Sequence, residues 1–342
     1  MNKDDMINCL KSVCKYHVDK SDLERIELLS KNIDDKTNNI LLKNKVELLF
    51  LKHCKEYGFE ENISPVYWKN YGNSLLALQF KYEEYLEEIY KITREFEKMK
   101  IPYAILKGFS FIGDLWSRKG IVYRYFSDVD LLVSKKDLKQ IHTILSKNNY
   151  VQGEIKENKI VKAERSALIY WALNSHQIHE YTKFSKYSNV SCIFRLNIDI
   201  NTTIFEGGKI IPPIKTEELL KNTISKNISD KVKIICLNYT YGLIQLCYHF
   251  YKDMHYENLV DSNTSCNLMK FCDLREFVLA YRDNINWNEF KNIIKKNNIE
   301  KQVLFPLFMV SSFYDDLNLD KCFNDFDIKL KEQSFCWENL VD

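Results

Sequence analysis

The chain has 342 residues, of which 45% are hydrophobic and 28% charged, and it contains only nine glycines and five prolines. This composition excludes a disordered chain and predicts an ordered globular protein with two or three structural units around a large core. Lys and Arg number 49 and Asp and Glu number 47, which leaves a formal net charge of +2. So balanced a charge argues against a long nucleic acid as partner, because duplex binding depends on neutralising many phosphates.

The expected location of the protein follows from the segments that its sequence lacks. The first residues show neither the basic start nor the apolar run of a signal peptide, and no stretch of about 18 apolar residues could span a bilayer. The ten cysteines are scattered without a C-x-x-C pair, a pattern typical of reduced thiols in a core. We therefore expect a cytoplasmic protein with no membrane span.

Residues 1–95 are expected to form an N-terminal helical region. Its periodicity is clearest after Gly72, where apolar side chains recur three or four positions apart, as on the buried face of a helix. These side chains are Leu75, Leu78, Tyr82, Tyr85, Leu86, Ile89 and Phe96. We expect this region to serve packing and to contribute no chemistry.

Residues 96–206 differ in character from the helical region. Proline ends the preceding helix at Ile101-Pro102, and the apolar run at 103–106 predicts a strand that enters a glycine turn. The β-branched and apolar segment 127–133 predicts a central strand, and alternating residues at 179–184 and 192–200 predict a hairpin of the same sheet. After residue 206 the periodicity is again helical, so residues 207–342 are expected to form a C-terminal helical bundle.

A helix is expected directly after the central strand. Ser134 and Asp137 have the spacing of a capping box, in which two side chains satisfy the first backbone N–H groups of a helix. Ile141, Ile144 and Leu145 then provide an apolar face. The order of strand, cap and helix predicts an α+β unit.

Two carboxylates interrupt the apolar strand at 127–133. Asp128 and Asp130 are two residues apart, so both side chains point to the same face of the strand. Two like charges in an apolar setting need a compensating cation, and Mg²⁺ suits carboxylates and substrate phosphates, with Mn²⁺ as an alternative. Asp199, between Ile198 and Ile200, is expected to complete a three-carboxylate site that permits two-metal phosphoryl chemistry.

The turn Lys107-Gly108-Phe109-Ser110 has the features of a phosphate-binding turn. Glycine lets backbone amides approach a phosphate, the start of a helix favours negative charge, and Ser110 can donate a further hydrogen bond. No G-x-x-x-x-G-K-[ST] or G-x-S-x-G motif occurs, so the P-loop and serine-hydrolase templates have no support.

Several other polar residues are weaker candidates for contact with a substrate. His176 and His179 could line the site, although a core or surface role is the simpler interpretation of each. His249 lies on an apolar helical face, where a hydrogen-bonded core histidine is the default, and Lys252 and Asp273 could contact substrate nearby.

These motifs resemble the DNA polymerase β-like nucleotidyltransferase superfamily and, within it, a family of uncharacterised bacterial nucleotidyltransferases. The shared features are Ile101-Pro102, Leu106-Lys107-Gly108, Arg124 and the segment Asp128-Val129-Asp130-Leu131-Leu132-Val133. The superfamily's Gly-Ser or Gly-Gly pair is spread here over Gly108-Phe109-Ser110. Both flanking helical regions are also similar in character, so the resemblance extends over most of the chain.

The resemblance implies an α+β fold in which a polymerase β-like nucleotidyltransferase core, a mixed sheet with helices, lies between two helical regions. It implies an enzyme that transfers a nucleoside monophosphate from a nucleoside triphosphate, with ATP the expected donor, to a hydroxyl-type acceptor, releasing pyrophosphate. The acceptor would be a small molecule, a peptide or a protein. Two alternatives stay open: phosphoryl or sugar-phosphate transfer on the same scaffold, and a non-catalytic protein that binds a nucleotide or another partner.

The resemblance also assigns roles to individual residues. Asp128, Asp130 and Asp199 would be catalytic and would bind the metal. Lys107, Gly108 and Ser110 would hold the phosphates of the nucleotide. Arg124 would offer its guanidinium to a phosphate or fix the strand that carries the aspartates.

Overall fold

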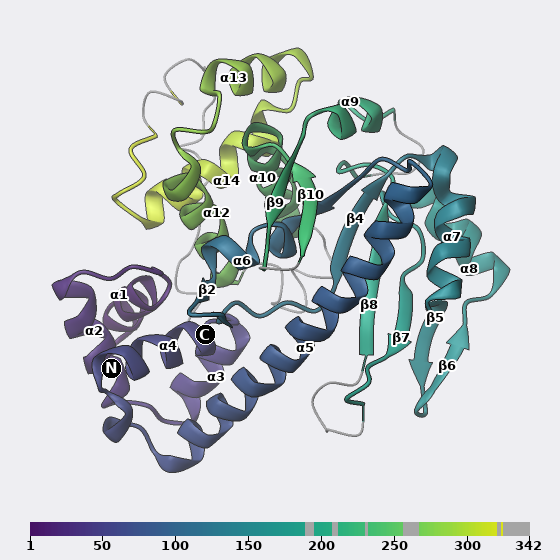
Figure 1. Cartoon of the computed structure of the whole chain (residues 1–342). Helices are drawn as coiled ribbons and strands as arrows, with labels where there is room; N and C mark the ends of the chain where they lie inside the picture. Colours follow the sequence, from purple (N-terminus) through teal and green to yellow (C-terminus); the bar gives the residue numbers. More distant parts are fainter. Residues whose placement is uncertain (189–194, 207–210, 230–231, 256–266, 320–322, 324–342) are drawn as a thin grey trace.

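The computed structural model describes residues 1–188, 195–206, 211–229, 232–255, 267–319 and 323. It confirms the expected α+β architecture with a mixed sheet. Figure 1 shows the sheet beside two helical groups, α1 to α4 from the start of the chain and α10 to α14 from its later part. The long helix α5 runs from the first group across the sheet.

Polar caps and a proline determine where the N-terminal helices begin. These helices are α1 (Lys3–Val13), α2 (Lys20–Ser30), α3 (Asp35–Lys43), α4 (Glu47–Tyr57) and α5 (Pro65–Lys98), with the 3-10 turn η1 (Glu60–Asn62) before α5. Asn2, Asp19 and Asp34 each accept a hydrogen bond from the backbone N–H three residues further on. Pro65 stands in the first turn of α5, where a missing N–H breaks no helical hydrogen bond.

Eight strands form the mixed sheet in the order β6-β5-β7-β8-β4-β1-β10-β9. They are β1 (Tyr103–Leu106), β4 (Val129–Val133), β5 (Val151–Lys156), β6 (Lys159–Lys162), β7 (Tyr181–Phe184), β8 (Arg195–Asn201), β9 (Thr223–Asn227) and β10 (Lys233–Leu237). Neighbours are antiparallel except β4 with β8 and β1 with β10. β2 (Ser117–Arg118) and β3 (Ile121–Val122) form a separate ribbon. Because β1 and β4 lie inside the sheet, all of their residues are buried.

Four strands match the sequence prediction. β1, β4, β7 and β8 fall within or beside the predicted segments 103–106, 127–133, 179–184 and 192–200, although residues 192–194 lie outside the described part of the chain. β7 and β8 are antiparallel neighbours, which confirms the predicted hairpin.

The expectation that the chain is purely helical after residue 206 is wrong. β9 and β10 form one edge of the sheet, and β10 pairs with the central strand β1. The apolar run of β10 is too short to show a period, so its sequence does not distinguish a buried strand from a piece of helix. β5 and β6, near the opposite edge, also lie outside the predicted elements, and their largely exposed side chains explain the weak signal.

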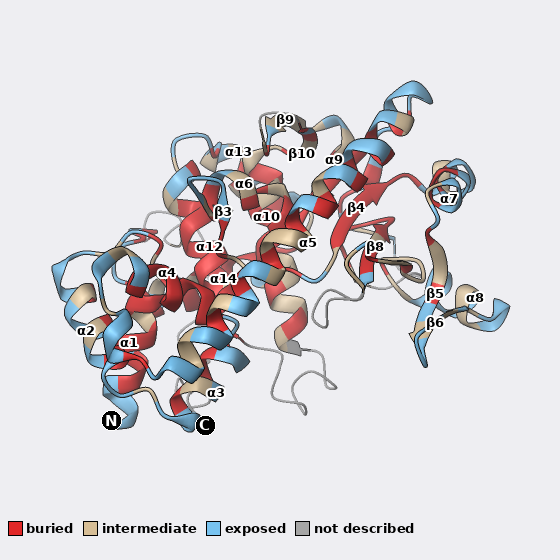
Figure 2. Ribbon diagram, turned by 60° about the horizontal axis from the view of Figure 1, so that its bottom comes forward, coloured by how far each residue is buried: buried red, intermediate tan, exposed pale blue. Residues whose placement is uncertain are grey.

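The remaining helices connect the strands or pack against them. They are η2 (Lys107–Ser110), α6 (Ile112–Leu115), η3 (Lys135–Asp137), α7 (Leu138–Lys147), α8 (Arg165–Asn174), α9 (Thr216–Lys221), α10 (Tyr239–His255), α12 (Leu268–Tyr281), α13 (Trp287–Lys296) and α14 (Glu300–Phe313). Figure 2 shows buried residues concentrated in β4, α12 and α14, whereas α8 contains none. α10 packs against both α12 and α14, which makes these three helices one unit.

Helix α7 confirms one part of its prediction and corrects another. Ile141, Ile144 and Leu145 are buried as expected. The capping box is wrong, because Ser134 makes no cap bond and instead donates to Glu217 Oε1 at 3.0 Å. The chain reaches α7 through the 3-10 turn η3.

Six of the ten cysteines lie in the described part of the chain, and all six are buried. Among the helices that the structure describes, none combines the length and the apolar character needed to cross a bilayer.

Candidate active site

Adjacent strands bring the three predicted aspartates together. In the register of the sheet, Asp130 of β4 lies beside Leu106 of β1 on one side and beside Asp199 of β8 on the other. Residues opposite each other on neighbouring strands point to the same face, and Asp128, directly before β4, is close enough for its charge to act on Asp130 and Asp199. Three carboxylates from two distant parts of the sequence therefore lie in one small area.

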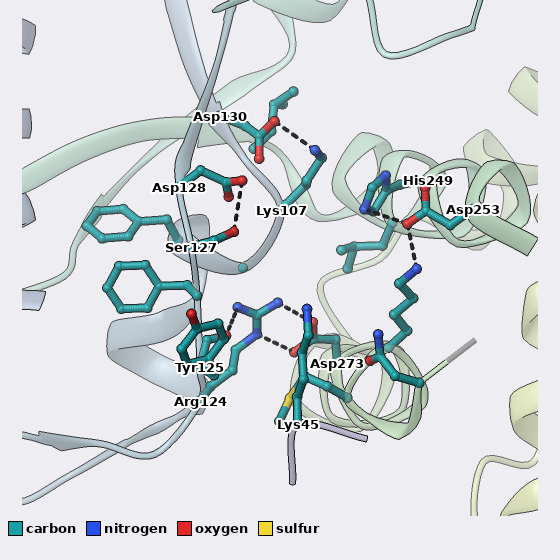
Figure 3. A pocket seen from close by; sticks show the side chains of 18 residues that line it. Lys45, Lys107, Arg124, Tyr125, Ser127, Asp128, Asp130, His249, Asp253 and Asp273 are labelled. Carbon is teal, nitrogen blue, oxygen red and sulfur yellow. Dashed lines mark hydrogen bonds and ion pairs between the residues drawn. The ribbon is translucent and has the colours of Figure 1, made fainter. Parts of the chain in front are cut away.

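Asp130 is held by two side chains from the neighbouring strands. Lys107 Nζ lies 2.7 Å from Asp130 Oδ1 (Figure 3), and Asn201 Nδ2 donates to the same oxygen at 3.1 Å. Asp130 is only 3% exposed, so these charge-assisted bonds form away from most water. Lys107 directly follows β1, and its left-handed backbone, with φ of 54°, turns the chain into η2. Asp128 accepts a hydrogen bond from Ser127 Oγ at 2.9 Å.

The carboxylates carry more negative charge than their surroundings compensate. Burial and the neighbouring Asp130 raise the pKa of Asp128, and burial together with Asp130 and Asp128 raises the pKa of Asp199 to about 8. Burial alone would lower the pKa of the Lys107 ammonium, but the carboxylates of Asp130 and Asp128 outweigh it and raise that pKa. Lys107 is thus firmly protonated beside the three carboxylates, Lys81 offsets part of the charge of Asp128, and further positive charge would stabilise this area.

Helix α5 fixes the strands that carry the aspartates. Tyr85 is fully buried, accepts a hydrogen bond from the Asn197 N–H at 2.7 Å, and places its hydroxyl 3.2 Å from the Ser127 carbonyl oxygen. Lys81, one turn earlier, donates to the same carbonyl oxygen at 2.9 Å. A single rigid helix therefore positions the start of β4 and the middle of β8 relative to each other.

A cavity of about 340 Å³ lies between this part of the sheet and helices α10 and α12 (Figure 3). The charged residues that line it are Lys45, Lys107, Arg124, Lys270, Asp128, Asp130, Asp253 and Asp273. Asp199 is not among the described residues that line this cavity, and it lies beside Asp130 in the sheet. The volume is within the range of small-molecule and cofactor sites.

Gly108 and Arg124 pack against each other at the cavity wall. Arg124 forms a bidentate ion pair with Asp273 of α12, with Nε and Nη2 at 2.7 and 2.6 Å from the two carboxylate oxygens. A Cβ atom at position 108 would lie 2.2 Å from Arg124 Nη1, so the guanidinium keeps this place only beside glycine. Arg124 thereby ties the segment before Asp128 to α12.

Ser110 is hydrogen-bonded within its own turn. Its hydroxyl donates to the Lys107 carbonyl oxygen at 2.7 Å, and it is not among the described residues that line the cavity beside the aspartates. Its visible contact is thus within the turn η2 itself.

Of the three histidines considered from the sequence, His249 lines the cavity. Its Nε2 lies 3.3 Å from Asp253 Oδ2, and burial together with nearby lysines lowers the pKa of His249 well below its usual value, which favours the neutral ring. His176 lies 3.4 Å from Lys252 Nζ through Nε2. Neither His176 nor His179 is among the described residues that line this cavity.

Several polar residues at or near the cavity, Asp253 among them, were not predicted from the sequence. Asn201 could have been found, because it follows Asp199 by two positions and therefore shares its strand face. Lys45, Asn267 and Lys270 carry no signal of their own. They reach the cavity only because the start of α12 packs against the turn between α3 and α4.

The donor set at the aspartates suits a hard divalent cation. Carboxylate oxygens are the ligands that Mg²⁺ prefers, and the uncompensated negative charge favours a cation at the same place. In the part of the chain that the structure describes, no three Asp, Glu, His or Cys side chains converge as metal ligands, and Lys107 engages Asp130. Binding of one cation by all three aspartates therefore requires their side chains to rotate.

Comparison with protein families gives one match. The family described as "Uncharacterised nucleotidyltransferase" matches residues 35–315, from the start of α3 to just beyond α14. No curated protein matches the chain. The matched range includes every candidate residue of the cavity and of the aspartate face.

Proposed function

The chain belongs to this family of uncharacterised nucleotidyltransferases, and we propose that it transfers a nucleoside monophosphate from a nucleoside triphosphate to a hydroxyl-type acceptor. ATP is the expected donor and pyrophosphate the expected second product. The acceptor would be a small molecule, a peptide or a protein. The sheet and its helices would correspond to a core of the DNA polymerase β-like type.

One observation carries this proposal beyond the family match. Asp130 and Asp199 lie side by side on adjacent strands, Asp128 directly precedes the strand of Asp130, and Asp128, Asp130 and Lys107 line the cavity beside them. Such a group of poorly compensated carboxylates destabilises a fold, so its presence at a cavity favours a functional role over a structural one.

Asp128 and Asp130 would hold Mg²⁺, or Mn²⁺ in its place, with Asp199 as a third oxygen ligand. When bound there, the cation would neutralise the triphosphate and make its α-phosphorus more electrophilic. Lys107 contributes a permanent positive charge beside Asp130 and is suited to contact a phosphate oxygen. Gly108 and Arg124 keep the segment before Asp128 in place through the ion pair with Asp273.

Asp199 is suited to receive the proton of the acceptor. Burial and the neighbouring aspartates raise the pKa of Asp199, and a bound cation would favour its ionised form, whose carboxylate oxygen would accept that proton as a general base. In the proposed reaction the acceptor oxygen bonds to the α-phosphorus, and the bond from that phosphorus to the bridging oxygen breaks. Pyrophosphate leaves, and the acceptor proton goes to Asp199.

Calorimetric titration of ATP, GTP, CTP and UTP, each with and without Mg²⁺, tests the proposal. The wild type is expected to bind one of the four in a magnesium-dependent way, and the variant Asp128→Asn/Asp130→Asn is expected to lose that binding. Asp283→Asn is the matched control, because Asp283 is an exposed carboxylate that is not among the described residues lining the cavity, and this variant should bind as the wild type does.

Circular dichroism of each variant separates loss of binding from loss of fold. A folded wild type that binds none of the four nucleotides would contradict the proposal. So would a folded Asp128→Asn/Asp130→Asn variant that binds the nucleotide with wild-type affinity.

A further inference from the structure

Three of the four cations at the cavity have a carboxylate partner. Lys107 pairs with Asp130, Arg124 with Asp273 and Lys270 with Asp253. Lys45 differs, because no carboxylate among the described residues forms an ion pair with it. Its Nζ lies 5.9 Å from the centre of the Tyr125 ring instead. A cation that faces a cavity without a counter-ion favours an anionic ligand.

The position of Lys45 is fixed by its neighbour Asn44. Asn44 is 1% exposed, and its Oδ1 and carbonyl oxygen accept the N–H groups of Leu268 and Met269 at 3.2 and 3.3 Å. The turn between α3 and α4 thus supplies the cap that α12 lacks from its own Asn267. Lys45 follows with a left-handed backbone, φ 59°, and lines the cavity beside the start of α12.

Lys45 is exposed to solvent, and charges of both signs lie around it at the cavity. Desolvation lowers the pKa of its ammonium most, repulsion by Lys270 and Arg124 lowers that pKa further, and Asp128 and Glu47 raise it. In Figure 3 Lys45 is seen next to the pair of Arg124 with Asp273, while Asp130 and Lys107 are seen at the other end of the cavity. An anion bound near Lys45 would relieve this repulsion.

Asn267 provides an independent indication of a ligand. Its side chain is 7% exposed and lines the same cavity, yet its Oδ1 has no hydrogen-bond partner among the described residues. A buried carbonyl oxygen without a partner is unfavourable unless a ligand or water satisfies it. A ligand for this end of the cavity would therefore combine an anionic group with a hydrogen-bond donor, as a nucleotide does.

We propose that Lys45, together with Lys270, binds the β- and γ-phosphates of the nucleoside triphosphate, so that the N-terminal helical region completes the nucleotide site. This inference rests on the proposed nucleotidyl transfer. Asn267 Oδ1 accepts a hydrogen bond from the sugar or the base of the same ligand. The packing of α12 on the α3–α4 turn is thus the element that assembles the site from both helical regions.

Substitution of Lys45 by Asn tests this assignment with little change to the backbone. Asn tolerates the left-handed conformation, so Lys45→Asn removes the ammonium while the turn is kept. We expect the magnesium-dependent affinity for the nucleotide chosen by the wild type, with ATP as first probe, to fall by about ten- to a hundredfold. The melting temperature should stay within a few degrees of the wild type.

Two further variants separate charge from structure. Lys45→Arg keeps the positive charge and should retain most of the affinity, and Lys43→Gln, an exposed lysine of the neighbouring turn of α3, should bind as the wild type does. Wild-type affinity of Lys45→Asn would overturn the inference, as would an equal loss in Lys45→Arg and Lys45→Asn. A wild type that binds no nucleotide would instead contradict the proposed function, so the two failures are distinguishable.

Discussion

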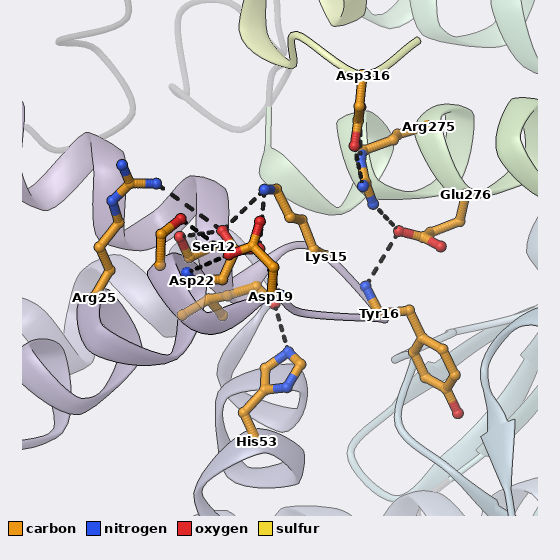
Figure 4. Close-up of polar contacts among 12 residues, drawn as sticks. Ser12, Lys15, Tyr16, Asp19, Asp22, Arg25, His53, Arg275, Glu276 and Asp316 are labelled. Atoms are coloured by element: carbon orange, nitrogen blue, oxygen red, sulfur yellow. Dashed lines mark hydrogen bonds and ion pairs between the residues drawn. The ribbon is translucent and has the colours of Figure 1, made fainter. Parts of the chain in front are cut away.

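Asp22 of α2 and Asp130 of β4 are both almost completely buried, with exposed fractions of 1% and 3%. Figure 4 shows Asp22 surrounded by donors: Ser12 Oγ at 2.8 Å, Lys15 Nζ at 2.9 Å and the Asp19 N–H at 3.2 Å. Asp130 has Lys107 and Asn201, but it also has two other carboxylates beside it. The donors around Asp22 compensate its charge, so Asp22 is a matched carboxylate. Asp130 instead shares Lys107 with the neighbouring carboxylates of Asp128 and Asp199.

The matched pattern recurs where α12 meets the N-terminal helices. Glu276 accepts the N–H of Tyr16 at 3.1 Å and pairs with Arg275, and Arg275 also pairs with Asp316 (Figure 4). Glu276 is thus provided with a hydrogen-bond donor and a cation by its neighbours, although burial still raises its pKa. Excess carboxylates at a cavity indicate that a ligand supplies what the protein lacks.

The largest effect on stability is expected when Asp22, the acceptor for Ser12, Lys15 and Asp19 in Figure 4, is removed. Asp22→Ala leaves Ser12, Lys15 and the N–H of Asp19 without their partner, and we expect the free energy of unfolding to fall by about 2–4 kcal/mol. Urea denaturation at pH 7 measures it. Asp283→Ala, at an exposed carboxylate, should stay within about 0.5 kcal/mol of the wild type. Equal effects of the two substitutions would remove the contrast between matched and surface carboxylates.

Removing a carboxylate from the group Asp128, Asp130 and Asp199 should instead raise the free energy of unfolding. Since the folded-state pKa of Asp199 is raised to about 8 from the usual 3.8, the native state holds a proton that the unfolded state releases, and stability falls as pH rises between these values. Asp199→Asn cannot ionise and should be more stable than the wild type by about 1–3 kcal/mol above pH 8, with the difference vanishing near pH 4. Urea unfolding across this range in the presence of a metal chelator measures the difference. If Asp199→Asn were less stable than the wild type at pH 8, the charge of Asp199 would be compensated by its surroundings, contrary to this account.

The last comparison concerns Asp273, a carboxylate at the cavity that is paired with Arg124. Gly108→Ala should displace Arg124 from Asp273 and lower the free energy of unfolding by about 1–3 kcal/mol. Gly72→Ala, in the interior of α5 with nothing within 4 Å of the new Cβ, should raise it by about 0.5–1 kcal/mol. Thermal unfolding of both variants compares them, and a stabilising Gly108→Ala would contradict the packing described for Arg124.

The aspartate pair could be predicted because its signal is local. Two carboxylates at i, i+2 beside an apolar run identify the strand, and the structure has Asp130 within β4 and Asp128 directly before it. Asp199 could be proposed from the same strand context, and the parallel register of β4 and β8 places it beside Asp130. Alternation and apolar runs were likewise sufficient for β1, β4, β7 and β8.

Long-range packing determined what the sequence did not show. Ser134 had the spacing of a helix cap, but its hydroxyl donates a hydrogen bond to Glu217, which lies 83 residues away in the sequence. Arg124 could be linked to the aspartate strand, yet its partner Asp273 lies 149 residues further on. Lys45 belongs to a helical region that was expected to serve packing alone, and it reaches the cavity through Asn44 and the start of α12. Contacts between residues so far apart in the sequence cannot be predicted from local sequence patterns.

Anomalous diffraction from crystals grown with Mn²⁺ and a non-hydrolysable ATP analogue tests the central claim most directly. The account predicts manganese bound by the carboxylates of Asp128 and Asp130, with the nucleotide in the cavity that these residues share with α10 and α12. Manganese and nucleotide bound elsewhere, with the aspartate face left unchanged, would contradict it.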